Sequence, residues 1–300
     1  MGARQLNSDT DRNTSKSQPL WRRVLLVIAA LGFILGIVLS YRAQPEVFSN
    51  LNPGILLLLA SVAVPLTVLL NALEFQKSAA LLGQKLALGP AAEVTIIGSV
   101  ANMLPIPGGT MVRIAALKAG GASLKKGTSV TLLVSLLWIS IAFIYAAFWL
   151  WGMGQRSSGG ISAVFAVIGV GALVACIWLF FRTAPKAQII GQLVLIKIGL
   201  VLIDATRIYL CFLALGVAGS FAQASVLTAS SVLGAAVSIV PAGLGIREGA
   251  AALLAPFIAL AAASAFLATS LNRIVGLAVM APVALFLGMR RDKAYQLVNQ

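Results

Sequence analysis

Residues 98–109 read GSVANMLPIPGG, and residues 234–245, 136 positions further on, read GAAVSIVPAGLG. Each stretch is an apolar segment of half-membrane length that Pro and Gly interrupt, with an arginine just after the break. Paired, interrupted hydrophobic segments in the two halves of a membrane protein are the best sequence indication of a central binding site. The matched positions are Gly98 with Gly234, Pro105 with Pro241, and Gly109 with Gly245.

The remaining sequence is typical of a helical membrane protein. Hydrophobic residues make up 60% of the 300 residues and charged residues only 10%, whereas a soluble domain is about a quarter charged. Lipid tolerates only helices or closed barrels, and these apolar runs are too long and too uniform for barrel strands. We therefore predict an all-α polytopic bundle. The predicted spans are residues 21–40, 54–73, 128–152, 160–181, 189–216 and 264–288.

One membrane domain is expected over residues 21–289. Residues 1–20 are polar and predict a disordered cytoplasmic tail, and residues 290–300 predict a short cytoplasmic tail. The run at 21–40 is followed by no clear small-x-small cleavage site, which favours a retained anchor helix over a signal peptide.

The net charge of +14 indicates membrane topology. Basic residues cluster before the first and third spans and after the second, fourth and last, whereas the alternate loops carry only Arg42 and Arg156. The positive-inside rule then places both termini in the cytoplasm, in a membrane of the bacterial inner-membrane type. Nucleic acid is not expected as a partner, because the sequence has no interleaved aromatic and basic surface.

The same topology predicts how the two interrupted segments lie. The first is flanked on both sides by cytoplasmic lysines, so it should enter the membrane and turn back. The second should do the same from the outer face, since three full spans lie between them and an odd number inverts the second unit. We therefore predict two opposed re-entrant hairpins in an inverted repeat.

The chemistry predicted for the hairpins is anion binding. Backbone freed by Pro and Gly at membrane depth requires protein or a wet cavity. A half-helix that restarts there presents N–H groups and a positive dipole end, and Arg113 or Arg247 beside it matches phosphate. The alternative is a Pro kink packed by small residues. The predicted ligand-binding residues are Asn102, Pro105, Gly108, Gly109, Arg113, Pro241, Gly243, Gly245, Arg247, Glu248 and Arg273.

Further charges lie within the predicted membrane zone and are costly there. Lys197, Asp204 and Arg207 are assigned structural or coupling roles, with Asp204 and Arg207 as a candidate i, i+3 pair. The alternative for Lys197 is snorkelling to the interface. Glu248 has Arg247, Arg273 or Lys197 as candidate partners, whereas Asn71, Glu74 and Glu93 are expected to be solvated at span ends. The surplus positive charge predicts an anionic lipid as ligand, a phospholipid or a polyprenyl phosphate.

Several classes of chemistry are not expected. The chain has no histidine, which removes His-based acid–base catalysis, His metal ligands and Ser-His or Cys-His nucleophiles. Cys176 and Cys211 both lie inside predicted spans, so a disulfide framework is not expected. No nucleotide-binding loop or metal-ligand cluster is present in the sequence, so we predict no metal and no cofactor.

These motifs resemble those of the lysylphosphatidylglycerol synthase transmembrane-region family, also called flippase-like. The resemblance covers about residues 21–289 and implies a multi-pass inner-membrane protein associated with lipid translocation. No appended transferase domain is recognised, so lysyl transfer is not implied. Thr110 stands where an acidic residue is frequent in the family, and Ala242 where Gly is usual. The residues that carry the resemblance are Asn102, Pro105, Gly108, Gly109 and Arg113, then Pro241, Gly243, Leu244, Gly245, Arg247 and Glu248.

Three functions follow as hypotheses. The first is a lipid translocase, or an accessory to one, that binds an anionic headgroup at a midplane site. The second is a membrane-embedded lipid transferase with Asp204 or Glu248 as base. The third is a non-catalytic partner in an envelope-lipid or glycan assembly, working with a separate enzyme subunit. An enzymatic role is the less favoured reading of the sequence.

Overall fold

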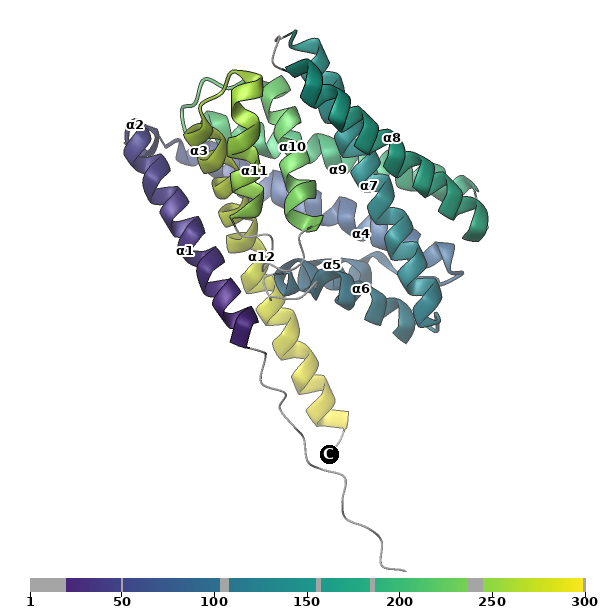
Figure 1. Cartoon of the computed structure of the whole chain (residues 1–300). Coiled ribbons are helices and arrows are strands. Elements are labelled where there is room, and N and C mark those ends of the chain that lie inside the picture. Colours follow the sequence, from purple (N-terminus) through teal and green to yellow (C-terminus); the bar gives the residue numbers. More distant parts are fainter. Residues whose placement is uncertain are drawn as a thin grey trace, which may run out of the picture.

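The computed structural model describes residues 20–49, 51–102, 108–154, 158–183, 187–236 and 245–298, and every regular element in these ranges is a helix. The predicted all-α class is confirmed. The elements are α1 (Leu20–Ala43), α2 (Glu46–Ser49), α3 (Pro53–Leu58), η1 (Leu59–Ala63), α4 (Val64–Leu81), α5 (Leu88–Ala101), α6 (Gly108–Ala119), α7 (Leu124–Gly152), α8 (Ser158–Thr183), α9 (Ala187–Ala214), α10 (Phe221–Ala236), α11 (Ile246–Leu254), η3 (Ala255–Ile258) and α12 (Ala262–Val298) (Figure 1).

Five helical segments of the described chain are long and apolar enough to cross a membrane. They coincide with five of the six predicted runs. The first predicted run lies in α1, whose described apolar part, Ala30–Ala43, is shorter. Helix α12 continues to Val298, beyond the predicted end of the last span. The five candidate spans are Pro53–Leu81, Leu124–Gly152, Ser158–Arg182, Ala187–Ala214 and Ala262–Met289.

The span Pro53–Leu81 consists of α3, η1 and α4 in one continuous helical run. Asn52 caps its start, because its Oδ1 accepts hydrogen bonds from the backbone N–H of Gly54 at 3.0 Å and of Ile55 at 3.3 Å. Pro65 has no N–H and would crowd the preceding turn of an α-helix. The wider π-helical turn η1 lies immediately before it and relieves this conflict within the span.

Two pairs of shorter helices correspond to the interrupted segments. α5 packs against α6, and α10 packs against α11 (Figure 1). Glycine allows close approach in both: a Cβ on Gly98 would lie 3.5 Å from the Cα of Gly109, and a Cβ on Gly234 would lie 2.8 Å from the Cβ of Arg247. Each interrupted segment is therefore a tight helix pair, with a glycine of its first helix facing the start of the second.

Helix packing follows the same pattern in the two halves of the chain. Along the first half α4 packs on α5, α5 on α6 and α6 on α7, while α9 to α12 pack in the same succession. Between the halves, α5 packs on α12, α10 packs on α7, and α4 packs on α9. The outer helices follow the same pattern: α8 packs on α7, and α1 packs on α12, which is the helix that corresponds to α7. Exchanging α4–α7 with α9–α12 leaves these packing relationships unchanged.

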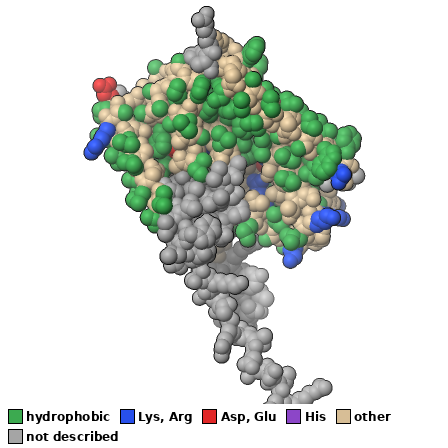
Figure 2. Space-filling model, in the orientation of Figure 1, with side chains coloured by type: hydrophobic (Ala, Val, Ile, Leu, Met, Phe, Trp, Pro, Cys, Tyr) green, Lys and Arg blue, Asp and Glu red, His purple; other side chains and the backbone are tan. Residues whose placement is uncertain are grey.

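The exterior is largely apolar. Figure 2 shows hydrophobic side chains over most of the described part of one face, with Lys and Arg mainly at its margins. Many large apolar side chains are exposed, such as Val167, Phe181 and Leu195. Such a surface is costly in water and suits a hydrocarbon surround.

Candidate functional site

Charged side chains gather in three groups inside the bundle. We call them the Glu74 cluster, the Asp204 cluster and the Glu248–Arg273 pair. Within the described residues these groups contain five cations and three carboxylates, so two positive charges remain uncompensated there. The Glu74 cluster is Asn71, Glu74, Arg113 and Lys197; the Asp204 cluster is Asp204, Arg207, Ser231, Arg247 and Asn272.

One carboxylate holds two cations in the Glu74 cluster. Oε1 of Glu74 accepts a hydrogen bond from Nη1 of Arg113 at 2.8 Å, and Oε2 accepts one from Nζ of Lys197 at 2.8 Å. These residues come from α4, α6 and α9. The side chains of Glu74 and Lys197 are 1% and 6% exposed, whereas that of Arg113 is 25% exposed. The surplus positive charge of this cluster is therefore accessible at Arg113.

Aromatic rings flank the two cations. Nζ of Lys197 lies 5.8 Å from the centroid of the Trp138 ring, and Cζ of Arg113 lies 6.0 Å from that of Phe75. Rings at this distance attract a cation through their quadrupole. They offset only part of the missing negative charge, since a ring carries no net charge.

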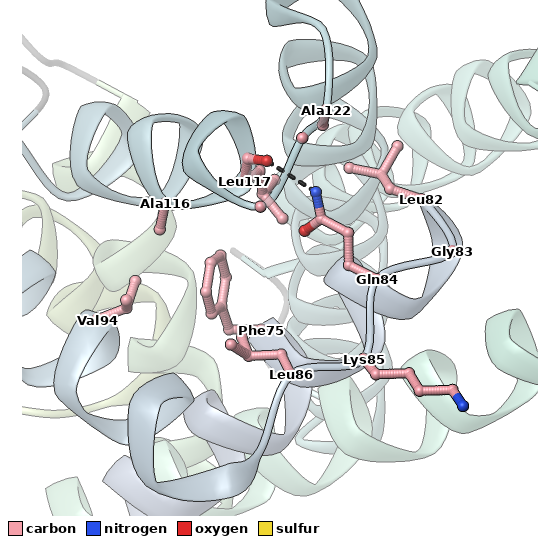
Figure 3. A pocket seen from close by; sticks show the side chains of 12 residues that line it. Phe75, Leu82, Gly83, Gln84, Lys85, Leu86, Val94, Ala116, Leu117 and Ala122 are labelled. Atoms are coloured by element: carbon pink, nitrogen blue, oxygen red, sulfur yellow. Dashed lines mark hydrogen bonds between the residues drawn. The ribbon is translucent and has the colours of Figure 1, made fainter.

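A pocket of about 430 Å³ lies beside this cluster, between the end of α4 and the helices α5 and α6. Figure 3 shows Phe75 at its centre and Lys85 extending away from it. Nε2 of Gln84 donates a hydrogen bond to the carbonyl oxygen of Leu117 at 2.8 Å and so ties the α4–α5 loop to α6. Because Phe75 also faces Arg113, the pocket and the Glu74 cluster share a wall.

The Asp204 cluster brings together α9, α10, α11 and α12. Oδ1 of Asp204 accepts from Nη2 of Arg247 at 3.2 Å, and Oδ2 accepts from the Ser231 hydroxyl at 2.6 Å. Nδ2 of Asn272 also donates to Oδ1 at 3.4 Å. Arg247 and Asp204 are 17% and 22% exposed, so this ion pair is open to a ligand at one side.

Arg207 is the second cation of the Asp204 cluster. It donates through Nη2 to the carbonyl oxygen of Asn272 at 3.1 Å and through Nη1 to the hydroxyl of Thr67 at 3.3 Å. It is buried, and among the described residues its Nε has no hydrogen-bond partner. Thr67 belongs to α4, so Arg207 extends the polar contacts of α9 toward the helix that carries Glu74.

The Glu248–Arg273 pair is fully internal. Oε1 of Glu248 lies 3.0 Å from Nε of Arg273, and the two side chains are 0% and 9% exposed. Oε2 of the same carboxylate accepts from the backbone N–H of Gly245 at 2.9 Å. Glu248 therefore caps the start of α11 and joins it to α12.

The helix starts of the two motifs have a feature in common. The backbone N–H of Gly109 donates to Oδ1 of Asn102 at 2.7 Å, and that of Gly245 donates to Glu248. These glycines are the matched positions of the sequence register. Both amides are thus taken by side chains of the protein, and anion binding by these two N–H groups would require displacing a side chain. The arginines are the available donors.

The structure corrects two expectations about the charges, the solvated position of Glu74 and the pairing of Asp204 with Arg207, and it adds the partners of other charged residues. Glu74 is buried and not solvated at a span end, because α4 continues to Leu81. For Lys197, the snorkelling alternative is wrong, since its buried ammonium pairs with Glu74. Among the described ion pairs, Asp204 is bound to Arg247 and not to Arg207. Arg113 and Arg247 contact different carboxylates, and the predicted residues Glu248 and Arg273 form a third ion pair.

The remaining predicted site residues fall into two groups, those that the structure describes and those outside the described residues. Asn102 binds freed backbone, one of its two predicted roles, and Glu248 pairs with Arg273, one of its three candidate partners. Gly108 is buried at the start of α6. Pro105, Pro107, Pro241 and Gly243 lie outside the described residues, as does the tail over 1–19.

Glu74 is the main residue that the sequence reasoning missed. Its signal was a polar stripe within an apolar helix: Thr67, Asn71 and Glu74 recur at helical spacing on one face of α4. Within the part of the chain that the structure describes, no three His, Cys, Asp or Glu side chains are grouped to hold a metal ion.

Long apolar helices, an apolar exterior and internal charge clusters together define a polytopic helical membrane protein. Within this class, residues 181–284 match the family model of the lysylphosphatidylglycerol synthase TM region. The predicted resemblance is confirmed over that segment, which contains the second motif and all of the Asp204 cluster. Among curated proteins, none matches the chain.

Proposed function

We propose that this protein binds an anionic lipid headgroup within the membrane and translocates it, or assists a translocase. The observation that carries the proposal is the surplus of two positive charges in three internal groups of side chains. Such charges are expensive in a bilayer and mark ligand or ion pathways by default. An anionic ligand compensates them. The match of residues 181–284 to the TM region of a lipid-modifying synthase supports lipid as the source of the anion.

The mechanism proposed is alternating exposure through an inverted repeat. It is supported by the helix packing, which is unchanged when α4–α7 and α9–α12 are exchanged. Support also comes from the three long helices α7, α8 and α9 between the two helix pairs, since an odd number of crossings inverts the second. We assign the pairs α5–α6 and α10–α11 as opposed re-entrant hairpins. Rocking of one repeat against the other would expose the arginines to each side in turn.

The orientation follows from charge. In Figure 1 the beginning of α1 and the end of α12 lie at the same end of the molecule, which supports placing both termini on one side. The positive-inside rule assigns that side to the cytoplasm, because the basic loops flank the first, third and last spans. We assign the protein to the inner membrane of a bacterial-type cell on this basis.

The test is lipid retention in mild detergent, read by native mass spectrometry. Wild type should retain an anionic lipid, and Arg247→Ala should retain less of it, because Arg247 is the accessible cation of its cluster. Arg42→Ala, which removes an exposed arginine of a loop-proximal helix end, is the matched control and should retain the lipid. Equal, unselective lipid in all three proteins would return the arginines to a structural role and favour the non-catalytic partner hypothesis.

A further inference from the structure

We propose that the Glu74 and Asp204 clusters are two headgroup sites of equal charge, each matched to a singly charged phosphodiester. This inference rests on the proposed function and specifies its ligand class. A phosphodiester carries one negative charge, and a phosphomonoester carries up to two. Two features of each cluster support it: its net charge and the open donors of its arginine.

The two clusters have the same charge. The Glu74 cluster holds Arg113 and Lys197 against one carboxylate, which leaves one positive charge. The Asp204 cluster holds Arg247 directly and Arg207 through Asn272, again against one carboxylate. The Glu248–Arg273 pair is neutral by itself. The total surplus is therefore divided evenly between the two clusters.

Each carboxylate is prevented from binding its arginine bidentately. In Glu74 one oxygen contacts Arg113 and the other contacts Lys197. In Asp204 one oxygen contacts Arg247 and the other accepts from Ser231. A guanidinium can donate two parallel hydrogen bonds to one anion. Each carboxylate therefore accepts only one of the two parallel hydrogen bonds that its arginine could donate to an anion.

The unused donors are identifiable. Among the described residues, the hydrogen-bond acceptor of Nη2 of Arg113 is Oδ1 of Asn71, at 3.5 Å, the limit for a hydrogen bond. In the described part of the chain, Arg247 donates only through Nη2; its Nε is buried, which leaves Nη1 as the donor open to a ligand. Both arginines are also the partly exposed cations of their clusters, whereas Lys197 and Arg207 are buried. A phosphate oxygen therefore has a donor to bind at each cluster without displacing the carboxylate.

Charge matching selects the ligand. One negative charge brings either cluster to neutrality, whereas two leave an uncompensated anion in a low-dielectric surround, where a bare charge is costly. Lys197 and Asp204 are seven residues apart on α9, about 10 Å along the helix axis. A singly charged headgroup that moves between the clusters therefore neutralises each site equally.

The experiment compares phosphatidylmethanol with phosphatidic acid of the same acyl chains, which differ by one methyl group and, at pH 8, by up to one charge. Native mass spectrometry of the full chain in nanodiscs, with phosphatidylcholine as the background lipid, measures retention. Wild type should retain phosphatidylmethanol at least about tenfold over phosphatidic acid, equivalent to about 1.4 kcal/mol. Dimethyl phosphate, a soluble diester, should not displace phosphatidylmethanol. Displacement would show that the sites bind a free phosphodiester, and would overturn the claim that they bind a lipid headgroup.

Asp204→Asn keeps the side-chain oxygen and raises the charge of its cluster to two. It should shift that site toward phosphatidic acid, while Glu46→Gln, an exposed carboxylate, should not. The wild-type comparison alone decides the inference if the variant fails to fold. Equal retention of both anionic lipids, or preference for phosphatidic acid, would overturn charge matching and leave the proposed function standing. No retention of either above phosphatidylcholine would overturn the proposed function itself.

Discussion

Glu74 and Lys197 are 123 residues apart in sequence and form an ion pair of 2.8 Å in which both side chains are buried. Each would be costly alone in the membrane. Glu74 also compensates Arg113, so a single carboxylate permits three helices to carry polar residues at their common contact. The stability of this region therefore depends on Glu74 more than on either cation.

Removal of that carboxylate should destabilise the protein strongly. Glu74→Ala leaves two cations without their anion, and breaking a buried ion pair costs about 3–5 kcal/mol. Thermal unfolding in detergent should show a large drop in midpoint. Glu46→Gln, at an exposed position, should leave it unchanged. Adding Lys197→Met to Glu74→Ala should restore part of the loss; an additive double variant would contradict the shared counter-ion.

Gly108 should not tolerate a side chain. A Cβ at this position would overlap the carbonyl oxygen of Ala101 across the α5–α6 pair. Overpacking of this kind costs about 1–3 kcal/mol or more. Gly108→Ala should lower the unfolding midpoint, whereas Gly159→Ala, which has open space around it, should not. Equal behaviour of the two variants would argue against tight packing of this helix pair.

Asn102 should act through its oxygen. Asn102→Ala leaves the N–H of Gly109 without its acceptor, which we expect to cost about 1 kcal/mol. Asn102→Asp keeps an acceptor and places a negative charge near the start of α6, where the helix dipole favours it. Denaturation should rank the proteins with Asp near wild type and Ala below. A stability loss in the Asp variant as large as in the Ala variant would refute this role.

Gly276 makes room for Arg207. A Cβ on Gly276 would lie 3.0 Å from Nη2 of Arg207, the atom that donates to the carbonyl of Asn272. Gly276→Ala should displace the guanidinium and cost about 1–2 kcal/mol, as for a hydrogen bond to a charged group. Gly288→Ala, in the same helix with nothing nearby, is the control. Thermal unfolding in detergent should show a lower midpoint for Gly276→Ala and an unchanged midpoint for Gly288→Ala. Equal midpoints in the two variants would contradict this role of Gly276.

The sequence predicted the helical class and the position of the long spans because hydropathy and span length are local properties. The matched glycines Gly98 and Gly234 each face the start of the following helix, whereas the opposed re-entrant arrangement stays a prediction. Pro105 and Pro241, which connect the helices of each pair, lie outside the described residues.

The partners of the charges could not be predicted from spacing. Asp204 and Arg207 are three residues apart on one helix, yet Asp204 binds Arg247. This contact arises because α10 packs against both α9 and α11 and so brings Arg247 within reach of Asp204. Glu74 was placed at a span end because hydropathy falls after residue 73, whereas helix α4 continues to Leu81. Tertiary packing, which hydropathy does not report, determines both outcomes.

The position of Lys197 and Asp204 on a single helix has a mechanical consequence. α9 supplies the buried lysine to one cluster and the carboxylate to the other, and a helix of this length transmits a turn or a slide nearly rigidly. Any such displacement of α9 must strain the Glu74–Lys197 and Asp204–Arg247 contacts at the same time. α9 therefore couples the two ion-pair clusters mechanically, so we expect both contacts to weaken together and to reform together.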